Sequence, residues 1–211
     1  MKFPLLNIDG SKSSSIEISD KLVKLKINYK LIKFVIDWQL NHAKPRVAQT
    51  KQRNKIKGST KKIVAQKGSG GARHASKKAP IFVGGGIAHG PKGAVYKIKK
   101  INKKVRKLAL AQTFSKKNQD KNLHILEDVK KEIKKTKEFY KFLAKNKLSN
   151  ILIISDENSL KNINKSARNI KDVKIIKDDG ANIYDLFKYK NVLITSSSAK
   201  KLESRILNEK N

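Results

Sequence analysis

Acidic residues are missing from a long internal stretch of this 211-residue chain. Asp37 is followed by no Asp or Glu until Asp120, and residues 38–119 carry 22 of the chain's 50 Lys and Arg side chains. A solvated basic face normally has acids among its bases, because unpaired like charges repel one another. The stretch therefore indicates a polyanionic partner, and the formal net charge of +33 argues against an ordinary metabolic enzyme.

Residues 44–93 are a compositionally distinct segment inside that stretch. They contain 9 of the 11 Gly and 3 of the 4 Pro, but only eight bulky apolar residues. Eight such side chains bury too little surface to offset the conformational entropy of ordering, at roughly 1–2 kcal/mol per residue. A loop of this length is unusual in a compact domain and is normally functional or disordered. We predict that residues 44–93 do not fold alone and become ordered on a polyanion.

The sequence on both sides of this segment predicts an α/β body. After residue 120 strands and helices alternate regularly, and residues 151–155 are a continuous apolar run typical of a strand buried on both faces. The expected fold is an open, mostly parallel sheet flanked by helices, with one long basic, Gly-rich extended loop. We expect a globular body of residues 1–43 and 94–211 and an extended loop of residues 44–93. The expected strands are 3–8, 16–18, 123–127, 151–155, 173–176 and 192–195, and the expected helices are 28–42, 103–115, 136–146, 157–168, 183–187 and 199–207.

Helical periodicity predicts which side chains these helices bury. The last helix is expected to be entered through Ser196, Ser197 and Ser198, any of which can act as its cap. The inward residues are expected to be Leu31, Ile32, Val35 and Trp38 in the first helix, with Ile36 or Leu40, and Val105, Leu108, Ala109, Gln112 and Phe114 in the second.

Motifs for nucleotide, metal and membrane chemistry are incomplete. Gly85 and Gly90 have the spacing of a phosphate-binding loop, but Pro91 and Lys92 follow, with no Ser or Thr. The four histidines are scattered, and the absence of Cys excludes thiolate nucleophiles, disulfides and Cys-ligated zinc. The longest apolar runs have four residues, whereas a membrane-spanning helix needs about 20. We therefore expect no catalytic residues, cofactor, metal or membrane partner, and a chain that stays inside the cell.

Several segments resemble the family of bacterial large-subunit ribosomal protein four. The loop of that family is similar to residues 61–74 (KKIVAQKGSGGARH), 79–86 (APIFVGGG) and 88–91 (AHGP), and the helix that follows it is similar to residues 102–110 (NKKVRKLAL). Residues 167–170 (ARNI) and 182–186 (NIYDL) extend the resemblance into the C-terminal half, so that it covers nearly the whole chain in the right order.

The resemblance implies a structural constituent of the ribosome, in the cytoplasm, that binds large-subunit ribosomal RNA and supports subunit assembly. It also implies a loop tip at the constriction of the nascent-peptide exit tunnel, where the partners are the nascent peptide and ribosomal protein number twenty-two. The tunnel-lining residues would be Val64, Ala65, Gln66, Lys67 and Gly68. Among the expected RNA contacts, Arg73 and Arg106 carry most weight, being two of only six arginines in the chain. The expected contacts are Arg46, Lys51, Arg53, Lys55, Lys57, Lys61, Lys62, Gln66, Lys67, Arg73, His74, Lys77, Lys78, Lys92, Lys103, Lys104, Arg106 and Lys107.

This sequence departs from the family pattern at three positions where the family usually has Arg: Ala65, Gly71 and Val83. Arg makes bidentate phosphate contacts that no apolar residue supplies, so the departures bear on how firmly the tip is anchored. Phe82 either stacks on a base or serves as a small hydrophobic anchor on the body.

Two other functions stay open at this point. An enzyme that uses the α/β sheet would have its site at the carboxyl ends of the strands, around residues 155–157 and 195–198. A general binder of DNA or anionic membrane surfaces would show similar affinity for any polyanion.

Overall fold

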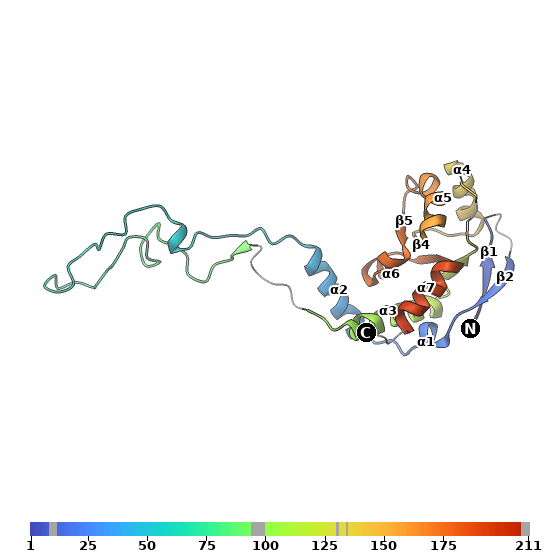
Figure 1. Cartoon of the computed structure of the whole chain (residues 1–211), viewed down its shortest axis with the longest axis horizontal. Coiled ribbons are helices and arrows are strands. Elements are labelled where there is room, and N and C mark those ends of the chain that lie inside the picture. The colour runs from blue at the N-terminus through green and yellow to red at the C-terminus, as the bar shows by residue number, and fades with distance from the viewer. Residues whose placement is uncertain (9–11, 94–99, 130, 134, 208–211) are drawn as a thin grey trace. The chain divides into compact units, whose positions relative to one another are not determined.

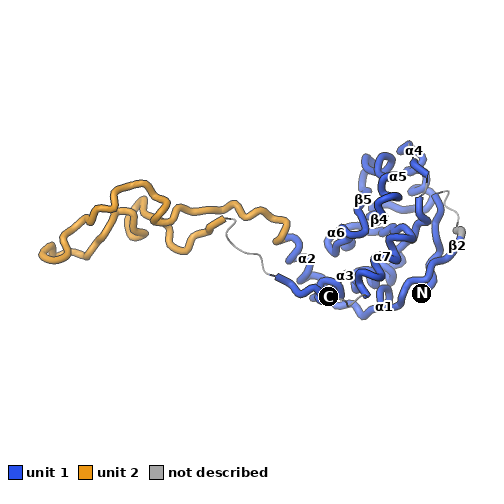
Figure 2. The backbone as a smooth tube through the Cα atoms, viewed as in Figure 1, with its two compact units in different colours: residues 1–40, 100–211 blue, residues 41–99 orange. Residues whose placement is uncertain are grey.

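The computed structural model describes residues 1–8, 12–93, 100–129, 131–133 and 135–207. The chain divides into two compact units, which Figure 2 distinguishes by colour. The body unit comprises Met1–Leu40 and Lys100–Asn211, and the loop unit comprises Asn41–Lys99. The expected return of the chain to the body at residue 94 lies outside the described residues.

Six strands form one sheet in the body unit, in the order β2-β1-β3-β6-β4-β5. β1 and β2 pair antiparallel, and all the other neighbours are parallel. The predicted fold class, a mostly parallel α/β sheet flanked by helices, is therefore confirmed. The strands are β1 (Lys2–Leu6), β2 (Lys12–Glu17), β3 (Leu123–Leu126), β4 (Ile151–Ser155), β5 (Val173–Lys177) and β6 (Asn191–Thr195).

Helices cover both faces of the sheet (Figure 1). The body unit has two apolar clusters, one on each face of the sheet, because successive side chains of a strand point to opposite faces. In β4, Leu152 and Ile154 enter one cluster, and Ile151 and Ile153 enter the other. All four of these side chains are fully buried, as expected for a central parallel strand. One face carries α1 (Asp20–Val23), α2 (Tyr29–Ala43), α3 (Lys103–Gln119), α6 (Ile183–Lys188) and α7 (Ser196–Leu207), and the other carries α4 (Thr136–Lys145) and α5 (Glu157–Ala167).

Several sequence predictions about the body were wrong: besides shifted element bounds and the unpredicted helix α1, three have a clear physical reason. Leu108 of α3 is 46% exposed, because the neighbouring elements pack on the side of the helix that carries Ala109, Gln112 and Phe114. Trp38 is only half-buried and lies on the wall of a surface pocket. α7 begins at Ser196, three residues before the predicted start. The early start of α7 has a physical reason, because Asp128, from the segment after β3, caps the helix. Its carboxylate accepts hydrogen bonds from the backbone N–H of Ser197, at 3.0 Å, and from the Ser196 and Ser197 hydroxyls.

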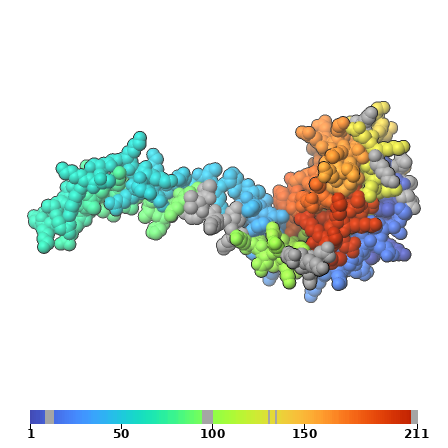
Figure 3. All heavy atoms as spheres, in the orientation of Figure 1, coloured from blue at the N-terminus to red at the C-terminus, as the bar shows by residue number. Residues whose placement is uncertain are grey.

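The described part of the loop unit contains no regular sheet. Its described part, residues 41–93, contains the end of α2, the short 3₁₀ helix η1 (Arg53–Lys55) and one isolated antiparallel bridge between Gln49 and Lys92. In the space-filling view this part is slender, so that most of its side chains lie at the surface (Figure 3). None of the helices in the described ranges is long and apolar enough to cross a membrane.

Candidate nucleic-acid interface

The loop unit presents its positive charge to solvent. Residues 44–93 contain thirteen Lys and Arg and no acid, so none of these cations has a carboxylate partner within its own unit. Twelve of the thirteen are exposed, and Lys78 is half-buried. Every residue of this segment that was predicted to contact RNA therefore lies on a surface without negative charge.

Backbone hydrogen bonds hold the two limbs of the loop together near its base. The Thr50 N–H donates to the Pro91 carbonyl at 2.9 Å, and the Gly93 N–H donates to the Ala48 carbonyl at 2.8 Å. Further along, the Ile87 N–H donates to the Lys51 carbonyl at 2.9 Å. The two ends of the described loop therefore lie side by side.

Gly86 allows the two limbs to lie in direct contact, and Gly85 allows a tight turn within the returning limb. A Cβ atom built on Gly86 would lie 2.3 Å from the backbone nitrogen of Arg53, and one on Gly85 would lie 1.9 Å from the Ala79 carbonyl oxygen. No side chain fits at such distances, so both positions require glycine to keep the loop's own path. The Gly-rich composition thus serves the packing of the loop against itself.

The predicted tip forms a separate lobe. The Ile63 N–H donates to the Ala75 carbonyl at 3.1 Å and closes residues 64–74 into one turn-rich segment. Gly68 and Gly70 adopt φ angles of 87° and 63°, a conformation that favours glycine. The Lys62 ammonium donates to the Gln66 side chain across the base of the lobe. Of the predicted tunnel-lining residues, Val64 is half-buried, and Ala65, Gln66, Lys67 and Gly68 are exposed.

Phe82 and His74 contact each other inside the loop unit. Their ring centroids are 5.0 Å apart at an interplanar angle of 64°, an edge-to-face arrangement. Both residues are half-buried, and the Nδ1 atom of His74 has no hydrogen-bond partner among the described residues. Phe82 therefore anchors the loop on itself through His74, a role that neither of the two predicted alternatives included.

The other predicted RNA contacts belong to the first turns of α3 in the body unit. Lys103, Lys104 and Arg106 are exposed, and Lys107 is half-buried. The Arg106 guanidinium lies over the Trp38 ring of α2, 5.4 Å from its centroid. This cation–π contact was not predicted from the sequence. The spacing of Trp38 along α2 is that of an inward-facing residue, so Trp38 was expected in the core.

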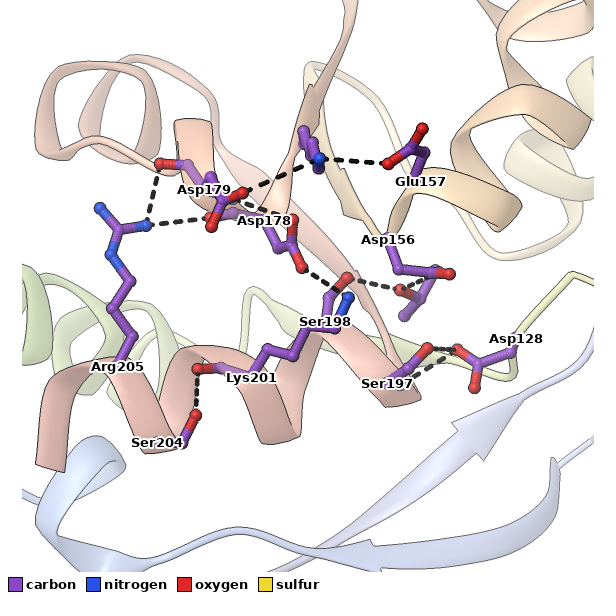
Figure 4. Close-up of polar contacts among 12 residues, drawn as sticks. Asp128, Asp156, Glu157, Asp178, Asp179, Ser197, Ser198, Lys201, Ser204 and Arg205 are labelled. Carbon is purple, nitrogen blue, oxygen red and sulfur yellow. Dashed lines mark hydrogen bonds and ion pairs between the residues drawn. The ribbon is translucent and has the colours of Figure 1, made fainter. Parts of the chain in front are cut away.

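Most of the polar groups at the carboxyl ends of the strands satisfy one another (Figure 4), but the buried Ser155 hydroxyl has no hydrogen-bond partner among the described residues. The Thr195 hydroxyl donates to the Ser198 hydroxyl at 2.9 Å, and Lys201 forms an ion pair with Asp178 at 3.2 Å. Burial alone would raise the pKa of Asp128, but the hydrogen bonds from Ser197 and Ser196 outweigh it and lower that pKa. These contacts cap α7 and join it to the sheet, and no group of metal-binding side chains occurs in the described residues.

The fold and this surface define a class of protein: an α/β body that carries an acid-free basic loop suited to a polyanion. Comparison with known proteins makes the assignment specific. A model of the Ribosomal protein L4/L1 family matches residues 16–205. The large ribosomal subunit protein uL4 of Pelagibacter ubique is 50% identical, with 97% of this chain and 99% of that protein covered. Proteins of the same name from Desulforapulum autotrophicum and Thermotoga maritima are 37% and 35% identical, with at least 95% of each chain covered.

The chain belongs to the Ribosomal protein L4/L1 family. The resemblance predicted from the loop motifs is therefore confirmed, and the chain is a structural ribosomal component. The prediction that it is not an enzyme is confirmed by the same membership, which removes the alternative of a catalytic site on the sheet.

Proposed function

We propose that this chain binds large-subunit ribosomal RNA through its loop unit, with the first turns of α3 as a second contact. The observation that carries the proposal is the exposure of twelve cations in a segment that contains no acid. Such a surface is stable only where phosphates or counterions neutralise it. Membership of a ribosomal protein family supports ribosomal RNA as the source of those phosphates.

The loop's lysines supply affinity, and its backbone supplies shape. Each lysine that replaces a counterion on a phosphate adds to affinity without reading sequence. The packing of Gly86 against Arg53 and the bond between Ile63 and Ala75 give the loop a defined path. Because folded RNA is recognised mainly by shape, a loop with a defined path selects a matching RNA channel over a simple duplex.

We assign the loop's tip, residues 64–68, to the wall of the nascent-peptide exit tunnel. There it lies opposite ribosomal protein number twenty-two and contacts the nascent peptide, and insertion of the loop supports assembly of the large subunit. The exposure of Ala65, Gln66, Lys67 and Gly68 and the closure of this lobe by its own backbone support the assignment.

Competition between RNA and DNA tests the RNA-binding proposal. The full chain is titrated with a folded large-subunit ribosomal RNA fragment, with duplex DNA of equal phosphate content as competitor. A shape-selective ribosomal protein prefers the RNA by at least about tenfold, whereas equal binding of both would identify a general polyanion binder. Vesicles of anionic lipid, added as a third competitor, distinguish a membrane-surface binder in the same way.

Photo-crosslinking tests the tip assignment separately. A photoreactive residue replaces Gln66 in assembled ribosomes that carry a stalled nascent chain, and a matched probe replaces the exposed Lys141 of α4. Crosslinks from position 66 to the nascent chain and to ribosomal protein number twenty-two are expected, with none from position 141. Crosslinks from position 66 to RNA alone would contradict the assignment.

A further inference from the structure

A pocket of about 410 Å³ opens on the body unit beside the cationic start of α3. Its walls come from α2, α3, the segment 179–183 and the end of α7. This volume lies within the range of roughly 300–1,000 Å³ that small ligands occupy. The buried side chains of Val35, Leu110 and Ile183 contribute the apolar part of its lining.

One side of the pocket combines an aromatic ring with positive charge. Trp38 lies on the wall with the Arg106 guanidinium 5.4 Å from its ring centroid. Lys103 lies about one turn of α3 before Arg106, and Lys107 follows Arg106 directly. Both lysines also line the pocket. An apolar lining beside a stacked cation and two ammonium groups matches the chemistry of a nucleotide, which joins a flat base to a phosphate.

The nearby acid does not cancel this charge. The Asp179 carboxylate is 83% exposed and pairs with Lys177 at 3.9 Å, while Arg205 is held by the carbonyl oxygens of Asp178 and Asp179, each at 3.0 Å (Figure 4). Within the described ranges, neither Lys103 nor Arg106 forms an ion pair with a carboxylate. The pocket therefore keeps a positive potential at its α3 side.

We propose that this pocket binds one unpaired nucleotide of an RNA strand, with its base stacked on the Arg106–Trp38 pair and its phosphate at Lys103 and Lys107. The proposal rests on the proposed function, since it identifies a subsite for the same RNA partner. A duplex does not fit a concave site with an apolar lining, whereas a splayed base does. The Asn182 side chain is already bonded to Asp185 and Gly180, so we expect little base preference.

Trp38 is the only tryptophan of the chain, so its fluorescence reports on this pocket alone. The full chain is titrated at constant ionic strength with a hexamer of adenylate ribonucleotides, an abasic hexamer and adenosine monophosphate. The intact hexamer should change the fluorescence saturably, at concentrations about 5- to 100-fold lower than the abasic hexamer requires. Equal curves for the two hexamers would overturn the proposal, and so would saturation by the mononucleotide as tight as by the intact hexamer, which would indicate a free nucleotide as ligand.

Two arginine variants provide the matched comparison. Arg106→Ala removes the stacked guanidinium, and Arg168→Ala removes the same charge from an exposed position after α5. Arg106→Ala should weaken the fluorescence response to the hexamer about 5- to 100-fold, and Arg168→Ala should leave it within twofold. Equal effects would overturn the proposal, because the pocket would then act only through net charge.

The same samples separate this proposal from the proposed function. If the chain prefers the ribosomal RNA fragment to duplex DNA while Trp38 responds equally to both hexamers, the pocket proposal fails and the RNA-binding function stands. If Trp38 responds to the intact hexamer while the chain shows no preference for the ribosomal fragment, the pocket proposal stands and the proposed function fails.

Discussion

The ammonium of Lys117 donates a hydrogen bond to the carbonyl oxygen of Tyr189 at 2.6 Å, inside the body unit. It also donates to the Lys190 carbonyl at 3.1 Å, so that one α3 lysine satisfies two backbone acceptors just before β6. The residue is only 7% exposed, and burial lowers the pKa of Lys117. A cation of the acid-free stretch is thus a structural element of the fold.

Replacement of this lysine should destabilise the body. Lys117→Met keeps the apolar stem but leaves two carbonyl oxygens without their donor, and each buried unsatisfied group costs about 1–3 kcal/mol. We expect the free energy of unfolding in urea to fall by at least about 1 kcal/mol. Lys141→Met, at an exposed position of α4, should change it by less than about 0.5 kcal/mol. Equal stability of the two variants would show that water replaces the ammonium.

The stability of the chain should depend on His124 below neutral pH. Burial in β3 lowers the pKa of His124 below its ordinary value of 6.5, and a hydrogen bond with Asn191 opposes this only in part. Between the two pKa values the unfolded chain holds a proton that the folded chain does not, so stability rises with pH in that window. The contribution is fully present above pH 6.5 and is lost as pH falls through the lowered pKa of the folded state.

Denaturant unfolding at several pH values measures this contribution. His124→Gln should flatten the stability curve below pH 6.5, whereas His89→Gln, at an exposed loop position, should leave the curve unchanged. If the free energy of unfolding of the His124→Gln chain changed with pH as steeply as that of the wild type, groups other than His124 would cause the pH dependence.

Glycine at position 86 should matter more to RNA binding than any single loop lysine. Gly86→Ala places a Cβ atom 2.3 Å from the Arg53 nitrogen, so the two limbs must separate. A strain of about 1–3 kcal/mol corresponds to a loss of about 5- to 150-fold in affinity for the ribosomal RNA fragment. Gly71→Ala is the matched control, because its nearest neighbour would be 4.0 Å away. Tolerance of Gly86→Ala equal to that of Gly71→Ala or Lys57→Ala would mean that the loop path is not needed.

Restoring an arginine at position 83 should strengthen RNA binding. The Val83 side chain is fully exposed in the loop unit. The resemblance of the loop sequence to its family leads us to expect Arg at this position. Val83→Arg should add one phosphate contact and steepen the slope of log affinity against log salt by about 0.7–0.9. Tyr140→Arg adds the same charge at an exposed site of α4 and should leave the slope nearly unchanged. Identical slopes for the two variants would place Val83 away from RNA.

The fold was predictable where local pattern decides it. The apolar run of β4 predicted a doubly buried strand at its observed bounds, Ile151–Ser155. The start of α7 was not predictable, because its capping carboxylate, Asp128, is nearly seventy residues away in sequence. The prediction that Leu108 points inward was wrong for a related reason. Periodicity identifies the apolar face of a helix, but the elements packed against the helix decide how much of that face is buried.

The sequence composition predicted which segment carries the candidate site, but it did not predict the side-chain contacts within that site. The absence of acids between Asp37 and Asp120 identified the basic surface, and the loop motifs identified the family. The partnership of Trp38 with Arg106 and the contact of His74 with Phe82 depend on side chains brought together across turns or between helices. In the sequence, Lys117 is one more lysine of the acid-free stretch, so only its burial in the structure reveals its role in the fold.

The salt dependence of binding by a charge-matched pair of variants tests the central claim, that the loop unit is the RNA-binding element. One variant replaces six loop lysines with Gln, and the other replaces six exposed body lysines, so that both have a net charge of +33 − 6 = +27. The loop set is Lys51, Lys55, Lys57, Lys61, Lys62 and Lys67, and the body set is Lys131, Lys137, Lys141, Lys147, Lys171 and Lys190.

Affinity for the folded ribosomal RNA fragment is measured between 50 and 200 mM salt for both variants and the wild type. If the loop lysines contact phosphates, the loop variant should lose about 4 to 5 from the magnitude of the slope of log affinity against log salt. The body variant should keep the wild-type slope to within about one contact. Equal slopes for the two variants would contradict the account, because binding would then follow net charge and not the loop.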